Sequence, residues 1–148
     1  MRNELAEIEI CCRGLIAETS GLLTWEWDDY IGTFLAAFGG EKTPAVSALC
    51  DKYFMSQWDV NSRSKMPPSI MAISDSLGGL RSSQILFVTR PGDFVIAYGA
   101  WWPWGDEKTI SLRIGLVTSN VPAFDGEKLF REFSEWFTNP HAAETTVS

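Results

Sequence analysis

Histidine is the natural starting point for catalytic chemistry, because its side chain exchanges protons near neutral pH. The chain of 148 residues has a single histidine, His141, within the final segment HAAETTVS. We expect residues 141–148 to form a loose tail, which cannot hold a base firmly beside a serine or cysteine nucleophile. One histidine also rules out a metal site with several histidine ligands. These residues therefore predict no catalytic group, no metal and no cofactor, and a protein that is not an enzyme.

Carboxylates are the other residues with chemical potential, and they gather at two places. One group lies in TWEWDDY and the other follows a tryptophan cluster; together they are Glu26, Asp28, Asp29, Asp106 and Glu107. Carboxylate oxygens bind divalent cations, but such acidic clusters are more typical of a solvated surface. Paired carboxylates for glycoside hydrolysis stay open, because such a pair is brought together in space and not in sequence. No phosphate-binding, dinucleotide, zinc or nucleophile-elbow motif is present.

The most unusual feature is the tryptophan content, seven in 148 residues, with three in GAWWPWGDEK at 99–108. Neighbouring strand residues point to opposite faces, so we expect one of Trp101 and Trp102 beneath the C-terminal helix and the other on the outer face. Pro103 should end the strand and carry Trp104 to the tip of a hairpin. These rings either cover the end of a small core or contact a partner, since tryptophan is frequent among interface hot spots.

Trp25 and Trp27 raise the same question, because we place both on a helix over residues 24–38. Two positions along a helix are about 200° apart, so these two indoles should not be equally buried. In each of the two tryptophan pairs, one indole is expected to lie outside the core. These two exposed indoles predict a partner-binding surface. The residues expected on that surface are Trp101, Trp102, Trp104, Asp106, Glu107, Trp25, Glu26, Asp28 and Asp29.

The first half of the chain has the periodicity of helices. Apolar residues repeat at helical spacing over residues 5–21, 24–38, 43–58 and 66–77. Glycine accepts the left-handed backbone that ends many helices, so Gly39 and Gly40 should end the second of these. Thr43 and Pro44 are typical of the start of the third.

The second half changes to β-rich segments, QILFVTR, DFVIAYGAWW and KTISLRIGLVT, which are joined by short turns. Short connections predict a three-stranded antiparallel β-meander. A last helix is expected over residues 125–137, packed on the sheet. The prediction is therefore a single α+β domain over residues 1–140, with N-terminal helices, the meander and a C-terminal helix, followed by the tail.

Charge narrows the range of partners. The formal net charge is −7, and residues 1–60 alone carry ten acidic and four basic side chains. Such a surface repels phosphate backbones, so we expect no nucleic-acid partner. A basic protein would be attracted instead.

The expected location is the cytoplasm, with no membrane partner. No apolar run reaches the ~18 residues of a membrane span, and acidic residues interrupt the N-terminal segment MRNELAEIEICC, unlike the core of a signal peptide. Cys11 and Cys12 are adjacent and Cys50 is alone. This spacing indicates buried reduced thiols and not a disulfide framework.

In size, acidity, aromatic surface and lack of a catalytic histidine, the chain resembles bacterial toxin-immunity proteins. The resemblance implies an inhibitor that binds a basic toxin or enzyme one-to-one, steered by charge and anchored by tryptophan. Two alternatives stay open. An acidic secretion chaperone or adaptor would hold an extended client segment at a sheet edge, and a small-ligand or sugar-binding domain would use the tryptophan cluster as a platform. The sequence also leaves a homodimer open.

Overall fold

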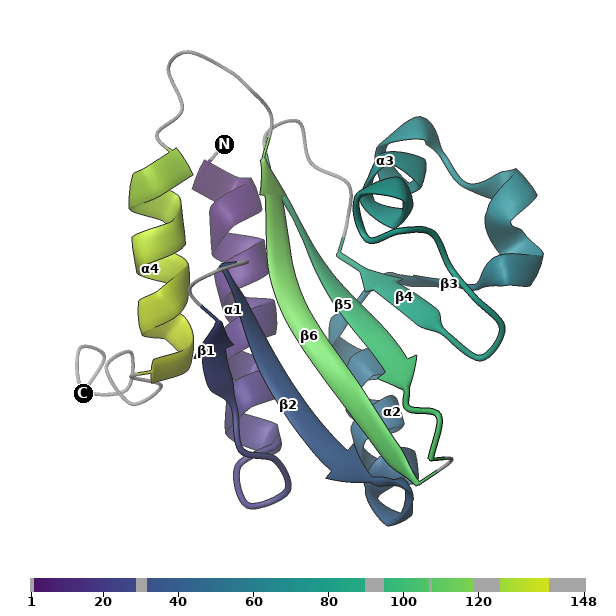
Figure 1. Cartoon of the computed structure of the whole chain (residues 1–148). Helices are drawn as coiled ribbons and strands as arrows, with labels where there is room; N and C mark the ends of the chain where they lie inside the picture. Colours follow the sequence, from purple (N-terminus) through teal and green to yellow (C-terminus); the bar gives the residue numbers. More distant parts are fainter. Residues whose placement is uncertain (1, 29–31, 90–94, 107, 119–125, 139–148) are drawn as a thin grey trace.

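A six-stranded antiparallel sheet organises the chain, in the strand order β1-β2-β6-β5-β4-β3 (Figure 1). The computed structural model describes residues 2–28, 32–89, 95–106, 108–118 and 126–138. The strands are β1 (Glu26–Asp28), β2 (Thr33–Gly39), β3 (Ser56–Trp58), β4 (Ile85–Val88), β5 (Val95–Pro103) and β6 (Thr109–Thr118). The helices are α1 (Arg2–Glu18), α2 (Thr43–Tyr53), α3 (Pro68–Ser76) and α4 (Gly126–Thr138), with short 3-10 turns η1 (Gly40–Lys42) and η2 (Val60–Lys65).

The α+β class is as expected, but the three-stranded meander is wrong. Its three segments do form neighbouring strands β4, β5 and β6. The sheet then continues on both sides, because β2 pairs with β6, β1 pairs with β2, and β3 pairs with β4. The meander is thus the centre of a wider sheet.

The largest error concerns the helix predicted over residues 24–38, which is the β1-β2 hairpin. Phe34, Ala36 and Phe38 alternate into the core, as a strand requires. Apolar residues at 34, 35 and 38 also satisfy helical spacing, so periodicity alone was ambiguous. Strand pairing favours the strand over the helix, because six residue pairs join β2 to β6. Thr and Phe also favour strands. The predicted helix residues Tyr30 and Ile31 lie outside the described residues.

The other helices agree with the sequence pattern. Leu15 on α1, Val46 on α2, Ile73 on α3 and Phe133 on α4 are all buried at positions expected to face a core. The third predicted helix ends earlier than expected, since α2 stops at Tyr53 and residues 56–58 form the edge strand β3. The tail 141–148, which includes His141, lies outside the described residues.

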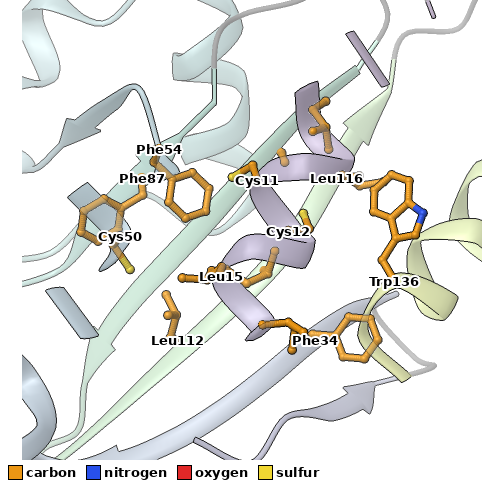
Figure 2. Packing of buried hydrophobic residues seen from close by; sticks show 14 of the residues in the cluster. Cys11, Cys12, Leu15, Phe34, Cys50, Phe54, Phe87, Leu112, Leu116 and Trp136 are labelled. Atoms are coloured by element: carbon orange, nitrogen blue, oxygen red, sulfur yellow. The ribbon is translucent and has the colours of Figure 1, made fainter. Parts of the chain in front are cut away.

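The main core lies on one face of the sheet, beneath α1, α2 and α4. Figure 2 shows side chains of α1 between Phe54 and Phe87 on one side and Trp136 of α4 on the other. The three cysteines are buried in this core and unbridged, as predicted. Aromatic rings meet edge to face here, for example Phe34 and Phe133 with centroids 5.6 Å apart.

The described residues cover the opposite face of the sheet over only part of its width. A second, smaller core places Ile70 and Ile73 of α3 against Leu86 of β4 and Ile96 of β5. Figure 1 shows α3 on the β4 and β5 side, with no described helix over β2. Ala37 of β2 is accordingly exposed on this face. The uncovered part of the face, over β6, β2 and β1, is called the open face below.

Candidate functional site

Trp101 and Trp102 lie on opposite faces of β5, as the strand pattern predicted. Trp101 is 5% exposed and joins the main core, with ring centroids 5.5 Å from Phe38 and 6.2 Å from Phe87. Trp102 is half-buried and packs against the second core on the other face. Trp101 is therefore a core residue and cannot contact a partner, whereas Trp102 is accessible in part.

Trp25 and Trp27 do not behave as predicted, because no helix forms there. Both are half-buried and pack against the same main core. The Trp25 indole N–H donates a hydrogen bond to the Thr19 hydroxyl at 3.0 Å, and the Trp27 ring lies 4.6 Å from that of Phe34. Residues two apart in extended chain point the same way, so both indoles face the main core, and each stays accessible in part.

Trp104 is the one exposed tryptophan, and all seven lie in the described part of the chain. Its side chain is 50% exposed at the β5-β6 hairpin tip, directly after Pro103 ends β5. The Trp104 amide donates to the Thr109 carbonyl at 2.8 Å, which positions the backbone that carries the indole. The sequence prediction of an indole at the hairpin tip is confirmed.

Asp106 makes hydrogen bonds to other residues of that tip. Its carboxylate accepts hydrogen bonds from the amides of Lys108 and Thr109, both at 2.9 Å, and from the Thr109 hydroxyl at 2.8 Å. The amide of Lys108, followed by the two bonds from Thr109, lowers the pKa of the Asp106 carboxyl. The Gly40 amide also donates to the Lys108 carbonyl at 2.8 Å, which ties η1 to the hairpin. These hydrogen bonds connect the described residues of the tip to one another and to η1.

The acidic group near β1 is partly committed to an internal contact. Asp28 accepts a hydrogen bond from Nη1 of Arg113 at 3.1 Å, and the same nitrogen donates to the Thr33 hydroxyl at 2.6 Å. Arg113 thereby joins β6 to β1 and β2 across the open face. Glu26 is exposed, whereas Asp29 and Glu107 lie outside the described residues. Two of the predicted acids, Asp28 and Asp106, thus have structural roles.

A pocket of about 370 Å³ opens where α3 meets the open face. It is lined by Ser76, Leu77, Ala100, Trp102, Ser111 and Arg113. The sequence predicted that one of Trp101 and Trp102 lies on the outer face, without deciding which, and it did not predict Arg113 as a site residue. The one sequence feature that could have indicated Arg113 is the alternation of polar and apolar residues in β6. This alternation places Ser111 and Arg113 together on the face away from the main core.

The buried thiols of Cys12 and Cys50 are poor nucleophiles. Burial raises the pKa of Cys50 to about 12, and a hydrogen bond with Cys11, together with burial, raises that of Cys12. A thiol with a raised pKa stays protonated at neutral pH and does not attack electrophiles. Among the described residues, no three histidine, cysteine or acidic side chains come together as a metal site.

Comparisons of the chain with models of known protein families, with curated proteins and with solved structures found no match. No described helix has the length and apolar character needed to span a bilayer. The described features that bear on function are the hairpin tip, the open face and the pocket.

Proposed function

We propose that this chain is a small acidic inhibitor of the toxin-immunity kind, which binds a basic toxin or enzyme one-to-one in the cytoplasm. The observation that supports it is Trp104, half exposed on a hairpin tip whose backbone is held by hydrogen bonds. The exposed half of this side chain contributes no apolar burial to the fold. Burying it in a partner would remove apolar surface from solvent.

The hydrogen bonds of the tip favour a binding role. Ordering flexible loops and side chains reduces affinity, so a preformed anchor binds more tightly than a mobile one. The carboxylate of Asp106 and the bond from Gly40 to the hairpin provide that order before any partner arrives. Tryptophan on a rigid loop is typical of the residues that contribute most to protein interfaces.

Charge supports a basic partner. The net charge of −7 would attract a cationic protein and speed its association at low salt. Exposed Glu41 of η1 lies next to the hairpin, because Gly39 pairs with Thr109 and Gly40 bonds to Lys108. Glu41 and Asp106 would then surround Trp104 with negative charge, offset in part by Lys108.

The chaperone alternative has weaker support. Such a protein would offer a long free sheet edge to a client strand. The two edge strands, β1 and β3, have three residues each. Short edges offer few backbone groups for pairing and are a common protection against it.

The test is replacement of Trp104 by alanine, with Met55→Ala as the matched control. Met55 is 62% exposed, between α2 and β3, so it is another accessible apolar side chain. Tagged wild-type chain purified from its native host should retain one basic protein at a one-to-one ratio and abolish that protein's activity. Trp104→Ala should weaken this complex by about 30-fold, or ~2 kcal/mol, measured by calorimetry. Equal loss of affinity in Met55→Ala, or no loss in Trp104→Ala, would contradict the proposal.

A further inference from the structure

The pocket beside α3 has a combination of side chains that the inhibitor proposal does not use. Trp102 and Leu77 supply apolar wall, Ala100 leaves space, and Ser111 and Arg113 supply polar groups from β6. Trp104, the proposed anchor, does not line it. A volume of about 370 Å³ is at the small end of ligand pockets. One ring with a short polar substituent matches this size.

Among the described residues that line the pocket, Arg113 is the only one with a charged side chain. Its two described hydrogen bonds, to Asp28 and Thr33, both use Nη1. A guanidinium has five N–H donors in a rigid fork, so these two bonds orient the group and leave Nε and Nη2 unused by them. A fixed arginine of this kind suits a planar anion, because two parallel N–H groups match a carboxylate.

The hydroxyl groups favour the same ligand chemistry. Ser76 donates its proton to the Ile73 carbonyl at 2.7 Å, so its hydroxyl is committed to α3. Ser111 makes only a long contact of 3.4 Å with the Trp102 carbonyl. Its hydroxyl is held weakly and can turn toward a ligand oxygen. The polar side of the pocket therefore combines an oriented cation with one adaptable donor.

We infer that this pocket binds a small aromatic carboxylate, with the ring against Trp102 and Leu77 and the carboxylate on Arg113 and Ser111. The site is independent of the proposed inhibitor function. Asp28 offsets part of the Arg113 charge, and the chain is acidic overall, so the affinity for a single-ring acid should be modest, with a Kd on the order of 1 mM. The carboxylate can belong to a free acid or to the C-terminal residue of a peptide.

Three ligands of nearly identical shape test the charge requirement. Benzoate, benzamide and benzamidine are anionic, neutral and cationic at pH 7, and each is titrated into the ¹⁵N-labelled chain. Benzoate should shift the Trp102 indole signal and the amides of Ser111 and Arg113, and bind at least ~10-fold more tightly than benzamide. Benzamidine should cause no such shift. Binding of benzamidine as tight as that of benzoate, or no benzoate shift at roughly 20-fold the expected Kd, overturns the inference.

Variants then test the location. Ser111→Leu should fill the pocket and abolish the benzoate shifts, while Ala37→Leu should leave them unchanged. The two positions face each other across β2 and β6, but Ala37 does not line the pocket. Ser76→Leu at the rim provides a second blocking variant if Ser111→Leu fails to fold. Benzoate shifts that persist in a folded blocking variant overturn the inference.

A further pair of ligands identifies the source of the carboxylate. N-acetylphenylalanine imitates a peptide C-terminus, and its amide lacks the charge. If N-acetylphenylalanine binds more tightly than benzoate, and its amide does not bind, the natural ligand is the C-terminal residue of a peptide. Tighter binding of benzoate indicates a free acid. Equal binding of the amide and the acid contradicts the role of Arg113.

Discussion

Replacing Arg113 by methionine removes the contact that joins three strands on the open face. The guanidinium donates to Asp28 of β1 and to Thr33 of β2 from its own strand β6. Methionine keeps most of the aliphatic length of arginine, so the change isolates the polar head. We expect the fold to persist with lower stability, because the main core lies on the opposite face.

The expected loss is about 2 kcal/mol. The Arg113–Asp28 pair is partly screened, with side chains 24% and 29% exposed, so it contributes at the upper end of a surface ion pair, about 1 kcal/mol. Thr33 is only 2% exposed, and its hydroxyl loses this hydrogen bond in a place that water reaches poorly, at a cost of roughly 1 kcal/mol more. A total of this size is a sizeable part of typical domain stability.

Urea unfolding measures this loss, with the same slope expected for each variant. Arg81→Met is the matched control, because Arg81 is exposed in the segment before β4; it should change stability by less than ~0.5 kcal/mol. A double-mutant cycle with Asp28→Asn should give a coupling of about 0.5–1 kcal/mol. A loss below ~0.5 kcal/mol in Arg113→Met, or zero coupling, would refute the reasoning.

Three further predictions concern the hairpin and the core. Hydrogen bonds hold the pKa of Asp106 in the folded chain below its ordinary value of 3.8. The ionised carboxylate therefore stabilises the fold fully above the unfolded pKa, and this stabilisation is lost as the pH falls through the folded pKa. The difference in urea midpoint between wild type and Asp106→Asn should shrink below about pH 4. Cys50, with a pKa of about 12, should react with a thiol reagent at pH 8 only at the rate of unfolding, and faster labelling would contradict its burial. Trp101→Ala should lower the free energy of unfolding by about 3–5 kcal/mol, whereas Trp104→Ala should change it by less than ~0.5 kcal/mol; similar losses in both would show that Trp104 is a packing residue.

Local sequence rules were sufficient where one signal dominated. In β6, apolar Leu112 and Ile114 alternate with polar Ser111 and Arg113, and the structure buries Leu112 and Ile114 completely. The same rule separated Trp101 from Trp102. Pro103 is the last residue of β5, because proline has no amide hydrogen to continue the pairing of the strand. Each of these follows from the backbone geometry of a few neighbouring residues.

The error at residues 24–38 arose because local pattern and long-range pairing disagreed. Trp25 and Trp27 were assigned to opposite sides of a helix, and the strand puts both against the main core. The partner strand β6 lies far along the chain, since Phe34 pairs with Ile114, which is 80 residues later. Local periodicity contains no information about such a partner, so the tryptophan surplus was overestimated.

By itself the sequence determined the α+β class, the negative charge, the buried thiols and the indole at the hairpin tip, because each depends on composition or on residues close in the chain. Only the tertiary structure decided the six-stranded sheet, the commitment of Asp28 to Arg113, and the pocket that α3, β5 and β6 form together. The physical reason is distance along the chain. Strand pairing, ion pairs and pockets join residues that are tens of positions apart, and their energies depend on geometry that no local pattern specifies.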